Sequence, residues 1–315
     1  MTTSPIIGIG LPKDETPKWV AALETAIAES GRPLRVDLDA SPEEIDYIVY
    51  NPFGEIRDFA PYTRLRAILN TWAGVEKILG HVALPEGVPF VRMVEEGMNR
   101  GMSEYFTAHV LRYHLDVDRA LAQSAEGRWE EWEPPLAKDR KIGILGLGAL
   151  GRSIAEMLGG IGFSLAGWSR SPKSLPGIDC HHGEEGLREV LSQAEILVVI
   201  LPLTGETRDV LNEVTLALMP RGACIVNAGR GELIDDDALL GALDSGQIRH
   251  ATLDVFRVEP LPSDHPFWRH PRITITPHIA AISRHDSGAS AIVAQIGRDM
   301  DGLGFQHVVD LARGY

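Results

Sequence analysis

The chain has 315 residues, of which 44% are hydrophobic, and its formal net charge is −14. This length provides for two hydrophobic cores and the composition excludes a disordered chain, while the negative charge argues against binding of nucleic acid. No apolar run reaches the roughly 18 residues that cross a bilayer, the start lacks the basic region of a signal sequence, and only Cys180 and Cys224 are present. We therefore expect a cytoplasmic protein with reduced thiols and no membrane contact.

Short apolar runs alternate with helical patterns along the first hundred residues. We expect strands at 6–9, 34–36, 47–50, 67–69 and 90–92. Continuous apolar strands separated by helices are typical of parallel sheets that are covered on both faces. This part of the chain therefore predicts a small α/β domain.

A strongly apolar helix is expected next, over residues 102–122. Its hydrophobic side chains lie around most of its circumference, so several sides must be covered. The arm 128–135 follows and carries Trp129 and Trp132. Because interface cores are often rich in aromatic residues, we expect a homodimer built on this helix and arm. Burial of both within one chain is the alternative.

Six further apolar runs predict a second parallel sheet, with strands at 142–147, 165–168, 196–201, 223–226, 251–255 and 273–276. The fold class is therefore α/β, with two doubly wound parallel-sheet domains. We expect residues 102–280 to form a Rossmann domain, and residues 1–101 and 281–315 to form a flavodoxin-like domain. The chain then crosses twice, because the apolar helical pattern within 292–300 follows the last strand and must cover another surface.

A glycine-rich loop lies between the strand that begins near residue 142 and a helical pattern. Residues 146–151 form a G-x-G-x-x-G motif. Its glycines are Gly146, Gly148 and Gly151, and Ala149 and Leu150 lie between the last two. In a strand–turn–helix context these glycines allow the tight turn, the approach of a pyrophosphate to the backbone and the close packing of helix on strand. The loop therefore predicts a dinucleotide site at the start of the helix.

The end of the following strand bears on the choice between NAD and NADP. Ser169 stands where an NAD enzyme places the acidic residue that binds the ribose hydroxyls, and Arg170, Ser171 and Lys173 follow. A guanidinium and an ammonium would bind a 2′-phosphate that a carboxylate would repel. We expect NADP(H) to be preferred, with NAD(H) possible; solvated loop charges are the alternative.

Four later segments carry a family resemblance. They are 201–207, 227–231 with Arg230, 254–262 with Glu259, and 276–281 with His278. In order and spacing they resemble the signatures of the D-isomer-specific 2-hydroxyacid dehydrogenase family, over essentially the whole chain. Segments 168–170, 259–262, 268–271, 275–278 and 312–315 most resemble the glyoxylate/hydroxypyruvate reductase A group within it.

The resemblance implies a catalytic set whose chemistry is coherent. Arg230 is the candidate for binding the substrate carboxylate and stabilising negative charge on the carbonyl oxygen. His278 is the candidate proton donor, and Glu259 would bind its other ring nitrogen and fix the tautomer. Taken singly, each could instead be a surface ion-pair partner, a buried histidine or a helix-start carboxylate.

The resemblance also implies the remaining site residues. Coenzyme contacts are expected from Leu201, Pro202, Thr207, Ala228, Gly229, Asp254 and Ala280. Substrate contacts are expected from Trp72, Ala73, Gly74 and Val75, whose backbone N–H groups would hold the carboxylate. Trp72 and Trp268 either narrow the pocket or pack in the core. We expect no metal, because the only adjacent histidine pair, His181 and His182, lies in a polar loop without other metal-ligating residues.

Two departures from the family pattern leave the substrate less defined. Gly229 stands where the family usually has a small residue with a side chain, a change that can loosen the loop before Arg230 but removes no chemistry. The segment 51–53 reads Asn-Pro-Phe, where we expect His-Pro or Trp-His-Pro from the resemblance to the reductase A group. We expect NADPH-dependent reduction of small 2-keto acids such as glyoxylate and hydroxypyruvate. The alternatives are reduction of larger 2-keto acids such as phenylpyruvate, and a dinucleotide-sensing protein like the family's corepressors.

Overall fold

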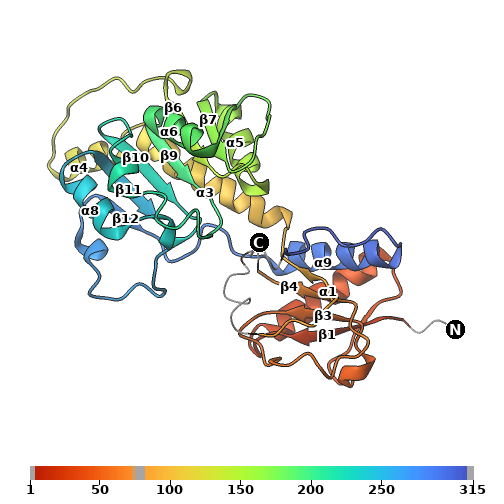
Figure 1. Cartoon of the computed structure of the whole chain (residues 1–315). Coiled ribbons are helices and arrows are strands. Elements are labelled where there is room, and N and C mark those ends of the chain that lie inside the picture. The colour runs from red at the N-terminus through yellow and green to blue at the C-terminus, as the bar shows by residue number, and fades with distance from the viewer. Residues whose placement is uncertain (1–3, 73, 75–81, 311–315) are drawn as a thin grey trace. The chain divides into compact units, whose positions relative to one another are not determined.

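The computed structural model describes residues 4–72, 74 and 82–310. The chain divides into two compact units, one of Met1–Met98 with Ser283–Tyr315 and one of Asn99–Ile282. Each unit contains one sheet, of five and seven strands, and the strands of both sheets pair in parallel (Figure 1). The predicted fold class is confirmed.

The first unit has the flavodoxin-like strand order β2-β1-β3-β4-β5. Its strands are β1 (Ile6–Gly10), β2 (Arg35–Val36), β3 (Tyr47–Tyr50), β4 (Ala67–Asn70) and β5 (Phe90–Val91). Its helical elements are α1 (Thr16–Ser30), η1 (Pro42–Glu44) and α9 (His285–Met300), and the first residues of α3 (Glu96–His114) also belong to it. Strand β3 is fully buried, as an inner strand of a sheet covered on both faces must be.

Helix α9 returns the end of the chain to this unit by packing along α1 (Figure 1). Gly288 makes close packing possible, because a Cβ there would lie 2.7 Å from the ring of Trp19, which is 2% exposed. Tyr47 of β3 donates a 2.6 Å hydrogen bond to Asp299 of α9. The apolar face of α9 and this polar contact therefore tie residues more than 250 positions apart into one core.

The second unit has the strand order β12-β11-β10-β9-β6-β7-β8, which is the Rossmann order with one added strand. Its strands are β6 (Lys141–Leu145), β7 (Ser164–Ser169), β8 (Asp179–His182), β9 (Ile196–Val199), β10 (Ala223–Asn227), β11 (Ile248–Leu253) and β12 (Ile273–Ile275). Its helices include α4 (Val117–Ala125), α5 (Ala149–Ile161), α6 (Gly183–Gln193), α7 (Glu213–Leu216) and α8 (Asp236–Asp244), with short 3-10 turns η2 (Ala137–Asp139), η3 (Gly231–Leu233) and η4 (Pro266–Arg269).

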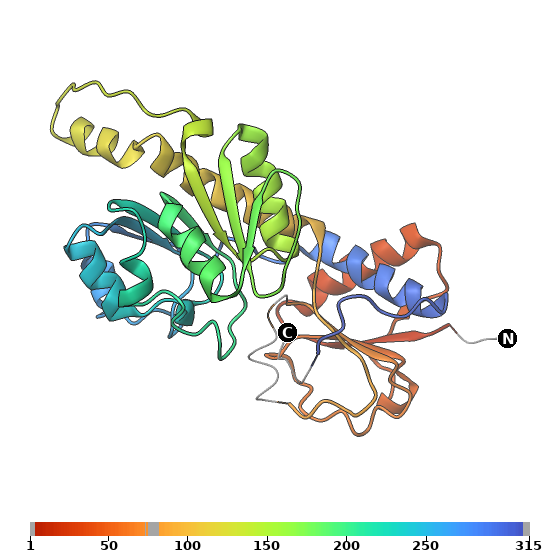
Figure 2. The ribbon, with the colours of Figure 1, turned by 45° about the horizontal axis from the view of Figure 1, so that its top comes forward.

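Two hydrophobic clusters hold this second sheet. One joins Phe106 and Val110 of α3 and Leu158 of α5 to inner strand residues. The other joins Val190 of α6 and Leu239 of α8 to the sheet. The helices are thus divided between two layers (Figure 2). The carboxyl ends of the strands, where open α/β sheets bind ligands, remain for polar residues.

Two sequence predictions need correction in this unit. The predicted helix 102–122 is two helices, α3 and α4, because Asp116 adopts a left-handed conformation (φ 55°) that ends the first and precedes the second. His181 and His182, which we placed in a polar loop, lie in edge strand β8. A short half-polar edge strand has no apolar pattern from which it could be predicted.

Helix α4 and the arm behind it extend beyond the sheet (Figure 2). Trp129 of the arm is 89% exposed and Leu121 of α4 is 61% exposed. Trp132, by contrast, stacks with the guanidinium of Arg119 at 4.8 Å. The arm therefore presents Trp129 to its surroundings, while Trp132 is partly buried beside Arg119 of α4.

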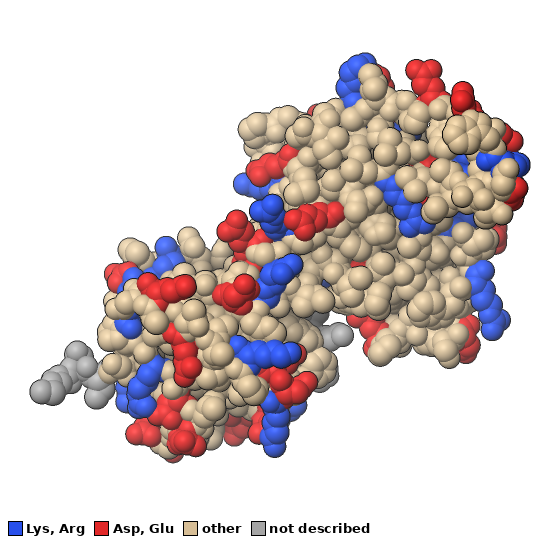
Figure 3. Space-filling model, turned by 180° about the vertical axis from the view of Figure 1, so that it is seen from behind, with Lys and Arg blue, Asp and Glu red and all other residues tan. Residues whose placement is uncertain are grey.

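The surface carries mixed charges. On the face shown in Figure 3, basic and acidic side chains are interspersed in both units. Of the helices in the described ranges, none combines the length and apolar character needed to span a bilayer. The mixed charges on the face shown in Figure 3 give no support to a polyanion-binding surface there.

Candidate active site

The glycine loop turns from β6 into α5. Gly146 has a φ of 112°, which a residue with a side chain adopts at a cost, and it allows the turn. A Cβ on Gly151 would lie 1.8 Å from the carbonyl oxygen of Gly146, so glycine is required for the helix to pack against the strand. A Cβ on Gly148 would meet no atom within 4 Å. The loop is therefore tightly packed at two positions and open at the third.

Arg230 follows β10 on a loop that the side chain of Asn227 holds in place. The Asn227 amide oxygen accepts from the Gly229 N–H at 3.0 Å, and its amide nitrogen donates to the Arg230 carbonyl at 2.9 Å. A Cβ on Gly229 would lie 2.9 Å from a methyl of Leu233 and 3.0 Å from the Leu201 carbonyl oxygen. The expectation of a loosened loop was wrong: glycine here permits a close backbone approach.

Gly231 sets the distance between the arginine loop and the loop after β11. A Cβ on Gly231 would lie 2.0 Å from the carbonyl carbon of Phe256 and 2.3 Å from the amide nitrogen of Arg257. The two backbones are therefore in direct contact. Glu259 lies on the second loop, where its Oε1 accepts from the Phe256 N–H at 3.1 Å. This bond holds one carboxylate oxygen and leaves the other for a different partner.

The loop after β12 is wrapped around the buried carboxylate of Asp254, which is 1% exposed. Its Oδ1 accepts from the hydroxyl of Thr276 at 2.5 Å and from the Ile279 N–H at 2.9 Å, and its Oδ2 accepts from the Ala280 N–H at 2.9 Å. Three donors compensate the cost of burying this charge. Asp254 therefore fixes both ends of the segment that contains His278.

His278 is held in a defined direction by backbone and side chain. Its φ is 54°, and its N–H donates to the Thr276 carbonyl at 3.0 Å. Its Nδ1 lies 2.9 Å from Glu259 Oε2. Because an ionised carboxylate only accepts, Nδ1 carries the proton of this bond, and Nε2 is the ring atom left to act on another molecule. The imidazole is half exposed, at 51%, which allows that access.

The end of β7 shows the predicted phosphate-binding residues in an exposed turn. The Ser169 hydroxyl donates to the Ser171 carbonyl at 2.8 Å, so its proton is used within the turn. The Arg170 side chain is 54% exposed and its Nη1 lies 3.8 Å from Glu206 Oε2. Lys173 is partly exposed. Both cationic side chains are therefore at least partly exposed, whereas the serine hydroxyl mainly shapes the turn.

The segment 201–207 is held by its own hydrogen bonds. The Thr207 hydroxyl donates to the Pro202 carbonyl at 2.7 Å and accepts from the Thr204 N–H at 2.8 Å. Leu201 and Ala228 are buried beside it, each 6% exposed. Thr207 thus determines the shape of the loop that begins at the carboxyl end of β9.

In the first unit, the predicted substrate-binding residues follow β4. Trp72 contacts Phe53 edge to face, with 5.3 Å between the ring centroids, and its carbonyl accepts from the Met93 N–H at 3.0 Å. Gly74 is partly exposed. Ala73 and Val75 lie outside the described residues.

The unusual segment 51–53 is also well ordered by hydrogen bonds. Asn51 is 2% exposed, accepts from the Phe53 N–H at 2.9 Å and donates to the Thr71 hydroxyl at 3.3 Å. Trp268 belongs to the other unit, where its Nε1 donates to the Pro262 carbonyl at 2.9 Å. Phe53, at 64% exposed, presents an apolar ring to its surroundings.

Sequence reasoning missed the residues that hold the site. Asn227 and Gly231 were noted only as neighbours of Arg230, and Thr276 only as part of a motif. A polar residue at the last position of an apolar strand, as Asn227 is, was the available signal. Among the described residues, no group of three or more His, Cys, Asp or Glu side chains is arranged to hold a metal ion.

A Rossmann sheet with a tight glycine loop and an arginine, a histidine and a glutamate at the ends of neighbouring strands defines a class of protein: dinucleotide-dependent oxidoreductases. Residues 107–280 match the family described as D-isomer specific 2-hydroxyacid dehydrogenase, NAD binding domain. The chain belongs to this family.

Individual relatives match almost the whole chain. A glyoxylate/hydroxypyruvate reductase A of Yersinia enterocolitica is 37% identical over 96% of this chain and 98% of its own length. A D-isomer specific 2-hydroxyacid dehydrogenase of Xanthobacter autotrophicus Py2, solved in complex with NADPH and MES, is 37% identical, with a TM-score of 0.91 over 99% of this chain and 100% of that chain.

A second solved relative is an NADPH-dependent glyoxylate/hydroxypyruvate reductase of Sinorhizobium meliloti, in complex with NADP and sulfate. It is 32% identical, with a TM-score of 0.84 over 99% of this chain and 100% of that chain. These comparisons confirm the resemblance to the family and to its reductase A group.

The glycine loop fits a dinucleotide coenzyme. The open space beside Gly148 lies at the start of α5, where the first N–H groups of a helix have no partner within the helix. A pyrophosphate would accept from such groups and be favoured by the helix dipole. The loop is closed by packing at Gly146 and Gly151, so the open position is the one that a ligand can use.

We expect Gly148→Ala to impair coenzyme binding and Gly151→Ala to impair the stability of the fold. The first adds a methyl where the protein has no atom, so the fold should persist while the coenzyme dissociation constant rises about tenfold or more, through loss of a charge-assisted contact. The second places a methyl on a backbone oxygen and should lower the melting temperature. Coenzyme titration and thermal unfolding of both variants separate the two effects. Unchanged coenzyme affinity in Gly148→Ala would contradict the assignment.

Proposed function

We propose that this enzyme reduces small 2-keto acids, glyoxylate and hydroxypyruvate among them, to 2-hydroxy acids, with NADPH preferred over NADH. The observation that carries the proposal is the 2.9 Å contact of His278 with Glu259, whose loop packs against the one that bears Arg230. The relatives named as reductases, one of them with bound NADP, support the same chemistry.

When bound, the nicotinamide coenzyme supplies the hydride that is added to the carbonyl carbon. The glycine loop would hold its pyrophosphate, and Arg170 with Lys173 would bind its 2′-phosphate. The other predicted coenzyme contacts lie at the ends of β9 to β12, at Leu201, Pro202, Ala228, Gly229, Asp254 and Ala280.

Arg230 serves the substrate carboxylate and the carbonyl oxygen together. Its guanidinium can donate to two oxygens in one plane, so it orients the ground state and stabilises the negative charge that develops during reduction. His278, protonated on both nitrogens, gives the Nε2 proton to that oxygen. Glu259 keeps Nδ1 protonated and stabilises the imidazolium by its charge.

On the substrate side, we propose that the N–H groups of Ala73, Gly74 and Val75 bind the carboxylate of the keto acid, with Trp72 beside them. The Phe53–Trp72 contact adds apolar surface after β3 and β4. The test of substrate class is a panel of glyoxylate, hydroxypyruvate and phenylpyruvate, each assayed with NADPH and with NADH. No turnover on the whole panel would defeat the proposed function, and a dominant rate with phenylpyruvate would replace its substrate class.

His278→Gln should keep coenzyme binding and lower kcat by about 10²–10⁴, the range for loss of a general acid. Arg230→Ala should lower kcat and raise the KM of the keto acid, because its charge acts in the ground state and in the transition state. Steady-state kinetics and coenzyme titration measure both effects.

A matched control for the histidine is His270→Gln, since His270 Nε2 also faces a carboxylate, Asp244 Oδ1, at 3.3 Å. It should retain native kinetics. Near-native kcat/KM in His278→Gln or Arg230→Ala would remove that residue from the catalytic set.

NADPH should exceed NADH in kcat/KM by at least about tenfold, the lower end of what one charge-assisted contact supplies, because Arg170 is half exposed. Arg170→Ala should reduce this preference mainly through the KM of NADPH, since the phosphate is remote from the reacting carbon. The measurement varies each coenzyme at saturating keto acid.

The control is Arg188→Ala, which removes an equally exposed arginine (53%) that pairs with Glu184 on α6. It should leave the preference unchanged. If Arg170→Ala also leaves it unchanged, Arg170 is a solvated loop charge and the phosphate site lies elsewhere.

We propose, finally, that the chain forms a homodimer through α3, α4 and the arm, because Leu121, Trp129 and Leu136 expose more than 60% of their surface there. Sedimentation at micromolar concentration should show a dimer, and Trp129→Ala with Leu121→Asp should shift it to the monomer. The control Leu38→Asp, at a residue 62% exposed in the first unit, should not. A stable monomer of the unmodified chain would exclude this interface.

A further inference from the structure

The side chain of Tyr105 joins helix α3 to the loop 276–280, which carries His278, by a hydrogen bond. Its phenol oxygen lies 2.7 Å from the hydroxyl of Thr276, and the same hydroxyl lies 2.5 Å from Asp254 Oδ1. Because the carboxylate only accepts, Thr276 must donate its single proton to Asp254. Tyr105 must then donate to Thr276. The three groups form a directed chain of hydrogen bonds.

These hydrogen bonds end at the carboxylate of Asp254, which holds the loop that carries His278, the candidate proton donor. Asp254 also accepts from the N–H groups of Ile279 and Ala280, so Thr276 and these two residues bracket His278. Burial raises the pKa of the Tyr105 phenol, which therefore stays protonated as a donor throughout the neutral range. The ring is held from the side by His109, at 4.5 Å between centroids.

We propose that Tyr105 is a positioning residue, which aligns the 276–280 loop, and with it the imidazole of His278, through Thr276 and Asp254. The expected effect on kcat rests on the proposed function, whereas the expected effect on the structure of the loop does not. Tyr105 itself touches neither His278 nor Glu259 among the described contacts; it acts on the loop that carries the histidine.

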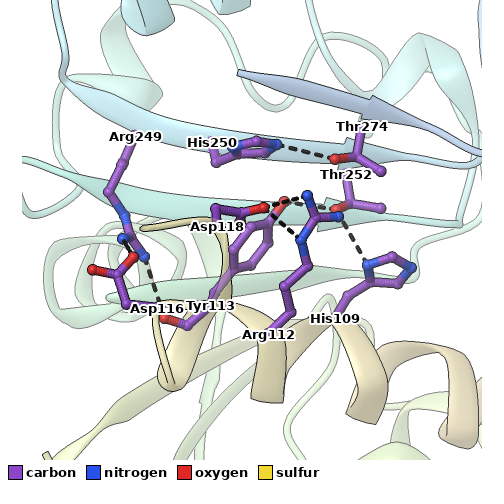
Figure 4. Close-up of polar contacts among 9 residues, drawn as sticks. All are labelled: His109, Arg112, Tyr113, Asp116, Asp118, Arg249, His250, Thr252 and Thr274. Carbon is purple, nitrogen blue, oxygen red and sulfur yellow. Dashed lines mark hydrogen bonds and ion pairs between the residues drawn. The ribbon is translucent and has the colours of Figure 1, made fainter. Parts of the chain in front are cut away.

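The same helix offers a matched comparison. Tyr113, two turns further along α3, makes a 2.6 Å hydrogen bond to the hydroxyl of Thr252 (Figure 4). That hydroxyl also lies 3.4 Å from His109 Nδ1, and among the described residues it makes no hydrogen bond to the 276–280 loop. Tyr113→Phe thus removes a buried tyrosine–threonine bond of the same kind without breaking the chain to Asp254.

The kinetic test uses Tyr105→Phe and Tyr113→Phe. Tyr105→Phe should lower kcat for glyoxylate about 3- to 10-fold, the effect of one buried hydrogen bond on the alignment of the reacting groups. It should also raise the primary kinetic isotope effect measured with NADPH deuterated at the transferred position. A loss of folded enzyme would lower kcat without altering that isotope effect. Tyr113→Phe should leave kcat per folded enzyme and the isotope effect unchanged.

A second measurement does not depend on activity. Amide hydrogen exchange at Ile279 and Ala280, whose N–H groups donate to Asp254, should become faster in Tyr105→Phe than in the unmodified protein, and remain unchanged in Tyr113→Phe. Thr276→Val should reproduce the effects of Tyr105→Phe, and Thr276→Ser should restore native exchange and kcat. The double variant Tyr105→Phe with Thr276→Val should be no worse than Thr276→Val alone.

The outcomes are separable. If the unmodified chain turns over no keto acid, the proposed function fails, while the exchange experiment still decides on the positioning role. If the chain is active but Tyr105→Phe has a native isotope effect and native exchange in the loop, the positioning role is excluded and the function stands. Equal changes in Tyr105→Phe and Tyr113→Phe would also exclude it, because they would mark a general loosening of helix α3.

Discussion

The candidate site depends on one buried charge, the carboxylate of Asp254. A carboxylate that is 1% exposed must be fully hydrogen-bonded, and three donors from the 276–280 loop satisfy it. Its own N–H donates to the Asn227 carbonyl at 2.9 Å, which links the ends of β10 and β11. The loop, with His278 in its left-handed conformation, therefore adopts the conformation that supplies hydrogen-bond donors to this carboxylate. The histidine is placed as a consequence of that requirement.

Backbone contact brings two of the three candidate catalytic groups, Arg230 and Glu259, onto adjoining loops. Gly231 lets the arginine loop touch the loop of Glu259, and Gly229 lets it pack against Leu201. Asn227 then holds the turn with two hydrogen bonds. Groups that are held by rigid neighbours need little reorganisation as charge develops, which is the condition under which fixed donors stabilise a transition state best.

The sequence predicted the two parallel sheets because continuous apolar strands and their separating helices have distinct periods. Arg230, Glu259 and His278 could be named as candidates because each follows a strand, within a motif that resembles a signature of the family. The sequence did not predict the break at Asp116, because a single residue with positive φ leaves the apolar pattern of the helix intact. Nor could it predict that Gly229 tightens its loop, because that depends on the Leu201 carbonyl, which is 28 residues earlier. Contacts between distant segments decide such cases.

The negative net charge of the protein makes the positions of its few candidate ligand-binding cations important. A chain with a net charge of −14 repels the anionic coenzyme and keto acid at long range, so binding has to come from local groups. Arg230 is held by its own loop, with Nη1 donating to the Gly229 carbonyl at 2.7 Å, whereas Arg170 is half exposed beside Glu206. The first geometry suits a cation that must meet a reacting atom at a fixed position. The second suits a phosphate far from the reaction, because an exposed guanidinium can bind a phosphate oxygen without a fixed position relative to the reacting atoms.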